Sequence, residues 1–417
     1  MFLGVLFVHA APAADRIYTP NADPAWARQQ DKAIRARLEQ GDLDSMANLL
    51  LFGTSFTRQP RITIEGLAEA SKSGIVRARV DDLVAGLRSP GDNERLALLR
   101  DVLLRKGIDL ESQQASSFIY SNLLRVLEER RTLAQRAADA KPASVLDRSS
   151  LFHDRGLSLD TSILPDFSLD QTLRDLKTRG VLREGQVARV AVIGPGLDFI
   201  DKQEESAFDY YPLQTLQPFA LYDSLVRLQL AKPGGLSVSI LDISARVLDH
   251  MKRARDRARK NNSYVIQLPR DIARPWSPAL TAYWRALGDQ LGAVVAPIQP
   301  PELFHGLETR AVRIRPDVVL ACEPVDLNIV VERLNLPTSE RFDLIVGTNI
   351  FVYYDAMEQT LALENAGAML KPGGLLLTND QLPESPTGVM RQAGITVIRF
   401  DDQDATAGDA VGWYQRR

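Results

Sequence analysis

Two glycines that directly follow a short apolar run form the first candidate binding site in the chain. The run is Val190–Ile193, and the glycines flank Pro195 in the sequence Gly194-Pro195-Gly196. A short run rich in β-branched residues that ends in glycine is typical of a strand buried on both faces. Because glycine has no Cβ, the following turn can be tight and its backbone can approach a ligand closely. The segment therefore predicts a strand followed by a nucleotide-type binding turn, although a single glycine turn is common in α/β proteins.

An acidic residue ends the next predicted strand, Leu236–Ile243. Asp242 stands at the carboxyl end of this strand with Ile243 beside it, and Ser244 could cap the helix that follows, 245–260. In a doubly wound sheet, a carboxylate at this place accepts hydrogen bonds from ribose hydroxyls. The alternative is an acid that only favours the start of the helix.

An amide and two aromatic side chains follow a further predicted strand, 343–347. The amide of Asn349 can both donate and accept hydrogen bonds, and a plain turn residue is its alternative role. Tyr353 and Tyr354 precede a predicted helix, 356–370, and could form the wall of a pocket. Adjacent aromatic residues at the start of a helix more often divide between core and surface. These three side chains are candidates for positioning a substrate.

Other catalytic chemistries have little support in the residue pattern. The 4 histidines have no metal-ligand spacing. Neither a Gly-x-Ser-x-Gly elbow nor a phosphate loop of the Gly-x-x-x-x-Gly-Lys type occurs. Cys322 is the only cysteine, so an internal disulfide is impossible. We therefore predict no metal site.

The second half of the chain alternates between strands and helices. Such alternation predicts an α/β fold with a doubly wound, mostly parallel sheet. The predicted strands are 190–193, 236–243, 317–321, 343–347, 375–378, 395–400 and 410–415, with helices at 245–260 and 356–370.

This order of motifs resembles that of the class I S-adenosylmethionine-dependent methyltransferases. The matching signatures are the glycine turn 194–196, Asp242, the strand Phe342–Val346 and the Leu-Lys-Pro-Gly-Gly turn at 370–374. The resemblance covers roughly 185–417. It implies a Rossmann-like, seven-stranded, mostly parallel sheet that ends in an antiparallel hairpin. Within the family, the Asn and the following aromatic pair look most like the fourth motif of the chemotaxis-receptor glutamate methyltransferases.

The resemblance implies S-adenosylmethionine as the cofactor and a role for each candidate residue. The glycine turn would approach the amino-acid part of the cofactor, Asp242 would hold the ribose, and Asp326, with Glu323 as the rival, would hold the adenine amino group. Methyl transfer is an in-line displacement, which needs positioning and exclusion of water rather than one universal catalytic group. The cofactor-binding residues so assigned are Gly194, Pro195, Gly196, Asp242, Ile243, Asp326 and Asn349, and the catalytic residues are Asn349, Tyr353 and Tyr354.

The chain departs from the family pattern at two insertions. The first, 200–218, separates the glycine turn from its helix, and the second, 263–310, contains Trp276 and Trp284. Both should lie near the carboxyl ends of the strands, where open α/β sheets bind ligands. We interpret them as parts of a substrate pocket, with surface elaboration as the alternative.

Two other functions are compatible with the sequence. A nicotinamide-dependent oxidoreductase is disfavoured because Phe199 stands where the fingerprint needs its third glycine, and because Asp242 lies far beyond the usual distance of about 20 residues. A non-catalytic protein that binds S-adenosylmethionine, or another ligand of a Rossmann-type fold, is the other alternative, since fold does not imply function. For the methyltransferase, the acceptor could be a small molecule or a protein side chain.

The chain of 417 residues is long enough for two or more cores, and its net charge of −3 comes without any basic block that would indicate nucleic-acid binding. Residues 15–140 predict a helical region, which could cover the pocket or recruit a substrate or partner. Residues 141–184 predict a linker and a helix, 169–179, that leads into the first strand. The methyltransferase-like part is 185–417.

Residues 1–14 resemble a secretory signal without its basic part, because an apolar run precedes Ala11-Pro12-Ala13. The segment is too short to span a bilayer, and we expect no integral membrane span. It favours export. The cytoplasm is the alternative, because S-adenosylmethionine is made inside cells.

Overall fold

A computed structural model of the chain describes residues 15–19, 23–63, 66–139, 156–157, 162–200, 208–302, 304, 306–404 and 406–417. The predicted signal-like segment, 1–14, lies outside the described residues, as do residues 141–155 and 158–161 of the predicted linker. Among the helices of the described residues, none is long and apolar enough to cross a membrane.

The centre of the fold is a 7-stranded sheet in the order β11-β12-β10-β9-β2-β3-β7. The neighbours from β10 to β7 run parallel, whereas β12 is antiparallel to both β10 and β11. The expected sheet with a terminal hairpin is therefore confirmed. The strands are β2 (Arg189–Ile193), β3 (Ser237–Asp242), β7 (Cys322–Asp326), β9 (Phe342–Val346), β10 (Leu370–Thr378), β11 (Met390–Arg399) and β12 (Gly408–Arg416).

One strand prediction is wrong. Residues 317–321 belong to a short helix, α11 (Pro316–Ala321), and the strand is the next segment, β7. Pro316 stands in the first turn of this helix, where its missing N–H costs nothing. The adjacent residues Val318 and Val319, which favour a strand by type, are both fully buried by the packing of α11 on α9. The packing of this short segment therefore overrides its β propensity.

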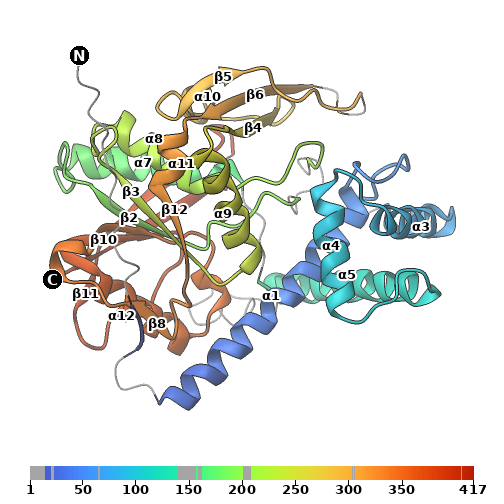
Figure 1. The fold of residues 1–417 in the computed structure, drawn as a ribbon, viewed down its shortest axis with the longest axis horizontal. Coiled ribbons are helices and arrows are strands. Elements are labelled where there is room, and N and C mark those ends of the chain that lie inside the picture. Colours follow the sequence, from blue (N-terminus) through green and yellow to red (C-terminus); the bar gives the residue numbers. More distant parts are fainter. Residues whose placement is uncertain are drawn as a thin grey trace.

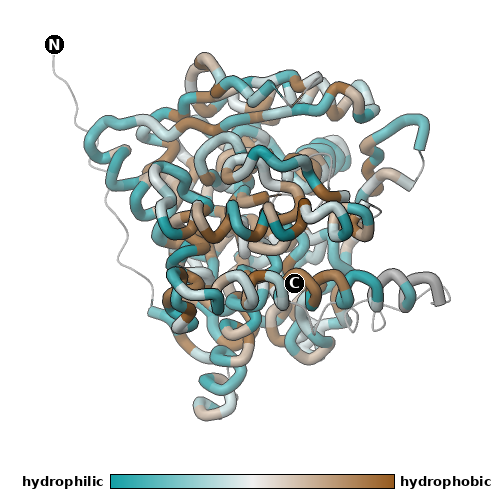
Figure 2. Tube along the Cα trace, turned by 90° about the vertical axis from the view of Figure 1, so that its right-hand side faces the viewer, coloured by the Kyte–Doolittle hydropathy of each residue, from teal (hydrophilic) through white to brown (hydrophobic). Residues whose placement is uncertain are grey.

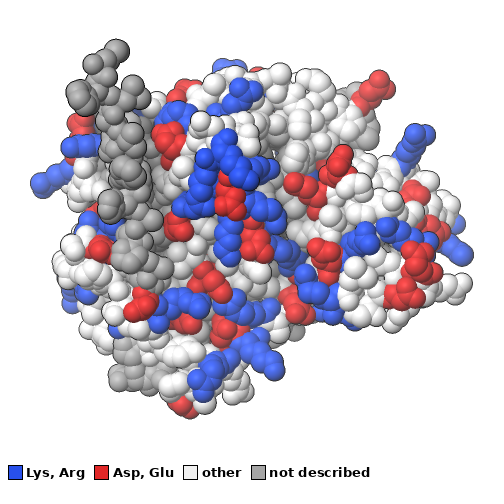
Figure 3. Space-filling model, in the orientation of Figure 1, with Lys and Arg blue, Asp and Glu red and all other residues white. Residues whose placement is uncertain are grey.

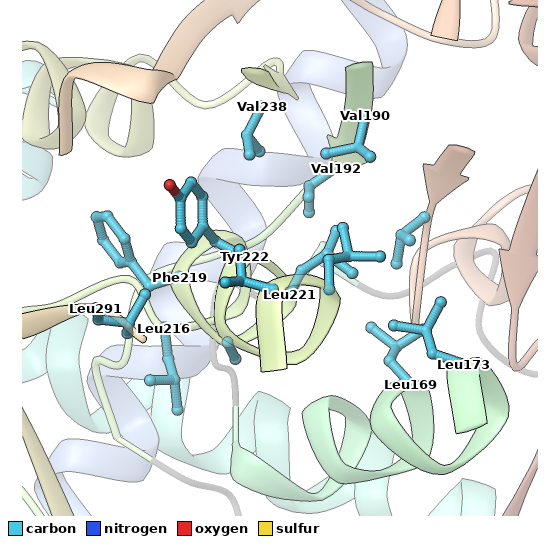
Figure 4. Close-up of a cluster of buried hydrophobic side chains, with 14 of the residues drawn as sticks. Leu169, Leu173, Val190, Val192, Leu216, Phe219, Leu221, Tyr222, Val238 and Leu291 are labelled. Carbon is cyan, nitrogen blue, oxygen red and sulfur yellow. The ribbon is translucent and has the colours of Figure 1, made fainter. Parts of the chain in front are cut away.

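The sheet is covered on both faces because alternate residues of each strand enter different cores. Val190 and Val192 of β2 pack with α7, α8 and α9, whereas Ala191 and Ile193 pack with α12 and the beginning of α1. Figure 4 shows the first core, in which side chains of α7 and α8 lie against the valines of β2 and β3. The helices are α7 (Ile163–Thr178), α8 (Gln217–Arg227), α9 (Ala245–Arg259) and α12 (Ala356–Met369).

The predicted helical N-terminal region is present as a bundle with its own hydrophobic core. Its longest helix, α1, starts beside the sheet near β8 and α12 and ends among the other bundle helices (Figure 1). In Figure 2, hydrophilic residues dominate the outer turns of the molecule and hydrophobic residues lie toward the interior. The bundle consists of α1 (Pro24–Phe52), α2 (Leu67–Lys72), α3 (Ile75–Arg88), α4 (Glu94–Arg105) and α5 (Gln113–Asp139).

The two insertions differ from their predicted limits. The first ends earlier than 218, because Gln217 already begins α8. The second continues to residue 314 and folds into a 3-stranded antiparallel sheet in the order β4-β6-β5. Its elements are β4 (Tyr264–Asp271), α10 (Pro278–Ala286), β5 (Gly292–Val295) and β6 (Leu307–Ile314).

Smaller differences concern the ends of elements. The helix before the first strand starts at Ile163 rather than 169, and both closing strands are longer than predicted. Residues 371–374 form an irregularity within β10 rather than a free turn. The predicted helical region also contains a strand, β1 (Arg16–Tyr18), which pairs with β8 (Glu332–Leu334).

Charged side chains of both signs are mixed on the surface. Figure 3 shows Lys and Arg gathered over α9 with Asp and Glu among them. The helix itself pairs Arg259 with Asp256 and Lys252 with Asp249. The helix therefore carries more basic than acidic residues, with acids interleaved among them.

Candidate functional site

A cavity of about 500 Å³ opens at the carboxyl ends of β2 and β3. We call it the edge cavity. It brings together six of the residues predicted from the sequence. It is lined by Leu38, Leu157, Ile193, Gly194, Gly196, Leu241, Asp242, Ile243, Leu327, Ile329, Ile350, Tyr353 and Tyr354.

The glycine turn forms one side of the edge cavity. Gly194 and Gly196 have φ values of 59° and 70°, a conformation that side chains with a Cβ rarely adopt. The amide of Gly194 donates to the carbonyl of Leu241, which fixes the turn to the end of β3. Ile350 lies against Gly194 where a Cβ would stand. The turn therefore exposes backbone to the cavity, but shares the space beside Gly194 with a side chain. Pro195 between the glycines is buried and is not among the lining residues.

Asp242 supplies the carboxylate of the edge cavity. It is only 7% exposed, and its Oδ1 accepts a hydrogen bond of 2.7 Å from the amide of Ser244. Burial raises the pKa of Asp242 to about 7, against the opposing effect of the amides of Ser244 and Ile243. Ser244 is the first residue flanking α9, as expected, but its side chain makes no capping bond. The carboxylate therefore has an acceptor oxygen for a ligand. Because its pKa lies near neutral pH, its charge depends strongly on pH.

The aromatic pair lies on the opposite wall. A turn of 3₁₀ helix, Phe351–Tyr353, brings both tyrosines to the edge cavity. Tyr354 is buried and Tyr353 half-buried. The side chain of Gln359 holds this turn by donating to the carbonyls of Phe351 and Tyr354. Both residues of the pair thus form a wall, as the sequence suggested.

Helix α1 closes the cavity from outside the sheet. Leu38 of α1 is one of the lining residues. The guanidinium of Arg35 donates to the carbonyl of Ile243 at 2.9 Å and to Asp326 Oδ1 at 2.8 Å. Arg37 donates to the carbonyl of Tyr353. Of the two roles that the sequence left open for the helical region, covering the pocket is the one this contact supports.

The two rival acids of β7 take different places. Asp326 is the last residue of the strand and lies in register beside Asp242, although it is bound by Arg35 and does not line the cavity. Glu323 pairs with Arg255 of α9 and does not line the edge cavity. Asp326 is therefore the better placed of the two, and its role stays a prediction.

Asn349 lies outside the edge cavity. It is exposed and has a left-handed backbone with φ of 57°. Its amide N–H and its side chain form reciprocal bonds of 2.8 Å with the side chain of Asn379. In this arrangement its side chain serves the turn after β9, which was the alternative role, and the assignment to catalysis stays a prediction. No group of three or more His, Cys, Asp and Glu residues among the described residues is placed to hold a metal ion.

A second cavity, of about 770 Å³, is walled by both insertions. We call it the insertion cavity. It contains three aromatic residues and, close to the glycine turn, the carboxylate of Asp198. It is lined by Ser162, Ile163, Leu164, Asp198, Phe208, Tyr211, Gln214, Leu216, Gln267, Leu268, Pro269, Arg274 and Trp276.

Sequence reasoning missed the residues that come from other parts of the chain. Leu38 and Arg35 are separated from the glycine turn by more than 150 positions, and no motif marks them. Ile329 lies just beyond Asp326, so a correct limit for β7 would have pointed to it. Asp198 stands two residues after Gly196, so the sequence alone could have marked it as an acidic candidate.

The edge cavity has an acceptor carboxylate and apolar walls that could suit a nucleoside. A carboxylate at the end of the second strand can accept from two neighbouring hydroxyls. Ile243, Leu327 and Ile329 offer apolar contact for a flat base. The glycine turn offers close backbone approach for the remaining part of the ligand.

No protein-family model matches the chain, and no curated protein matches it. Solved structures do. The N-methyltransferase NodS from Bradyrhizobium japonicum is 14% identical with a TM-score of 0.28, over 60% of this chain and 94% of that one. The magnesium protoporphyrin IX methyltransferase from Synechocystis, solved with bound SAM, is 9% identical with a TM-score of 0.28, over 69% and 90%. A TehB-like SAM-dependent methyltransferase from Corynebacterium glutamicum is 10% identical with a TM-score of 0.25, over 61% and 98%. The likeness extends to the fold alone, and the fold class rests on the strand order of this chain.

Proposed function

We propose that the chain is an S-adenosylmethionine-dependent methyltransferase whose cofactor binds in the edge cavity. The observation that carries the proposal is the meeting of two left-handed glycines, a buried carboxylate and an aromatic wall at the carboxyl ends of β2 and β3. The surrounding sheet is the mostly parallel arrangement with a terminal hairpin that the sequence resemblance implied. When bound, the cofactor would supply a methyl group on a positively charged sulfur.

The chain's own residues would bind and orient the cofactor. Asp242 accepts hydrogen bonds from the ribose hydroxyls, and the apolar residues beyond β7 contact the adenine. Gly194 and Gly196 let the backbone approach the amino-acid part. Helix α1 and the tyrosine pair exclude water from the cavity, so that most of the rate enhancement comes from positioning.

Calorimetric titration of the full chain with S-adenosylmethionine and S-adenosylhomocysteine tests the proposal. We expect saturable binding at micromolar concentration. In Asp242→Ala we expect binding at least about tenfold weaker, because at least one charge-assisted hydrogen bond to the ribose is lost. The matched control is Asp249→Ala, which removes an exposed acid from α9 and should bind like the unaltered protein.

Absence of binding by a folded protein contradicts the proposal. Binding of a nicotinamide dinucleotide instead would favour an oxidoreductase. Binding of S-adenosylmethionine without methyl transfer to any acceptor would favour a binding protein. A glutamate carboxylate, the acceptor of the receptor glutamate methyltransferases, is the alternative to a small-molecule acceptor and rests on Asn349 and the tyrosine pair. If it is correct, Asn349→Ala should abolish transfer to such a carboxylate.

A further inference from the structure

The insertion cavity is a built site that the cofactor proposal does not use. Its walls come from the start of α7, from both insertions and from the residues after the glycine turn. Phe208, Tyr211 and Trp276 are its aromatic members, and four leucine or isoleucine residues add to its apolar surface. A mostly apolar cavity with a few polar groups in its wall is the usual form of a small-molecule site.

The two cavities share one loop. Gly194 and Gly196 face the edge cavity, whereas Asp198 lines the insertion cavity. Because Gly196 and Asp198 are two residues apart, their Cα atoms are at most about 7 Å apart. Thr215 of the first insertion donates to the carbonyl of Gly196 at 2.9 Å, which fixes this loop. A ligand in the insertion cavity would therefore lie next to a cofactor in the edge cavity.

Asp198 is the acceptor group at this boundary. Its Oδ2 accepts from the hydroxyl of Tyr211 at 2.8 Å and from the side-chain amide of Gln214 at 2.9 Å. None of the hydrogen bonds among the described residues involves its Oδ1. The residue retains some solvent exposure, so an oxygen is open to a ligand. Burial raises the pKa of Asp198, with Arg95 acting against it, which is the situation of a carboxylate that would gain from a further donor.

The site is held rigidly. Gln214 and Gln267 brace the two insertions, because the side-chain oxygen of Gln214 accepts from the amide of Gln267 and its nitrogen donates to the carbonyl of Gln267. Arg95, from the N-terminal bundle, donates to the carbonyls of Asp198, Phe199 and Tyr211. Rigid walls of this kind reduce the entropy lost on binding.

The lining also indicates the charge and shape of the ligand. Among the described residues that line it, the ionisable side chains of opposite sign are Asp198 and Arg274, which suits a neutral molecule. Three aromatic side chains favour a flat ring. We propose that the insertion cavity binds the methyl acceptor as a neutral aromatic compound whose O–H or N–H group donates a hydrogen bond to Asp198. The role of acceptor rests on the proposed methyltransferase function, whereas the aromatic site itself does not.

Titration calorimetry of the full chain with 2-naphthol and its methyl ether, 2-methoxynaphthalene, tests this inference. We expect the unaltered protein to bind 2-naphthol about tenfold more tightly than the ether, since only the alcohol can donate to Asp198. In Asp198→Ala the two compounds should bind about equally. Trp276→Leu, on the other wall, should weaken both by about tenfold. Trp26→Leu, which alters a half-buried Trp of α1, is the matched control and should change neither. Thermal unfolding of each variant checks that it is folded.

Three results would overturn the inference. They are no saturable binding of 2-naphthol below about 1 mM, equal binding of alcohol and ether by the unaltered protein, or unchanged binding in Trp276→Leu. Saturating S-adenosylhomocysteine should leave 2-naphthol binding intact, because the two cavities share none of their described lining residues. Competition between the two ligands would also contradict the proposal. If 2-naphthol binds as expected but neither sulfur ligand binds, the aromatic site stands and the methyltransferase proposal fails.

Discussion

At the scale of single residues, Asp242 makes cofactor binding depend on pH. Its pKa of about 7 lies well above the ordinary value of 3.8. Ribose hydroxyls donate to the ionised carboxylate, so the affinity should follow the ionised fraction. This fraction rises from about one tenth at pH 6 to about nine tenths at pH 8, and the affinity for S-adenosylhomocysteine should rise about ninefold. Calorimetry at the two pH values measures it. An equal rise in Asp242→Asn would show that another group is responsible.

The same carboxyl should affect stability with a defined sign. Between pH 4 and pH 7 the folded protein keeps a proton on Asp242 that the unfolded chain has already lost. Ionisation of this group therefore opposes folding, and its cost grows as the pH rises through this window. Asp242→Asn should gain free energy of unfolding relative to the unaltered protein between pH 5 and pH 7, by roughly 4 kcal/mol at most. Urea denaturation at both pH values tests this, and a difference that shrinks with pH would contradict it.

At the scale of elements, α1 is a cover that belongs to two parts of the molecule. Residues 41–52 are all buried, whereas the preceding half contacts the edge cavity through Leu38 and Arg35. Arg35 pairs with Asp31 and Asp326, all of them partly exposed. Partly exposed ion pairs contribute little to stability, about 1 kcal/mol or less. Their main effect would be to hold the cover in place.

Arg35→Ala should therefore change cofactor kinetics more than stability. We expect the dissociation rate of S-adenosylhomocysteine to rise several-fold, because α1 opens more readily, while the melting temperature shifts by only a few degrees. Stopped-flow displacement and thermal unfolding measure the two effects. Arg28→Ala, an exposed cation on the same helix, is the control, and equal rates in the two variants would argue against a covering role.

At the scale of the whole molecule, Arg95 joins the bundle to the sheet part. Its side chain is 2% exposed and donates to three backbone carbonyls of residues 198–211. Phe199 and Ile200 of the same stretch, and Leu213 just beyond it, are part of the bundle core. The bundle therefore supports the wall of the insertion cavity, and the two parts should unfold together.

Arg95→Ala leaves these carbonyls without their donor in a buried place. We expect a loss of about 2–4 kcal/mol in the free energy of unfolding, typical of breaking a buried polar network. Urea denaturation followed by tryptophan fluorescence measures it. Arg100→Ala, on the exposed side of the same helix, should change stability by less than about 0.5 kcal/mol. A similar small change in Arg95→Ala would show that the bundle and the sheet part are not joined through this side chain.

The sequence by itself located six of the seven strands of the central sheet and several residues at their ends. Glycines with positive φ, a strand-ending acid and apolar runs are local signals, so Gly194, Asp242 and the buried strands could be found by type and spacing. The 317–321 segment shows the limit of such reasoning, because its valines favour a strand locally and α9 decides otherwise.

Only the tertiary structure decided what closes and separates the cavities. The contacts of Arg35 and Arg95 join residues more than 100 positions apart, and such pairings leave no periodic pattern in the sequence. The placement of Asn349 depends on its partner Asn379, which lies on a neighbouring loop. Both insertions line the same cavity. This depends on how each insertion packs against the rest of the molecule, because its amino-acid composition does not determine where in the fold it lies. Local chemistry is therefore readable from the chain, whereas its assembly into two adjoining cavities depends on long-range packing.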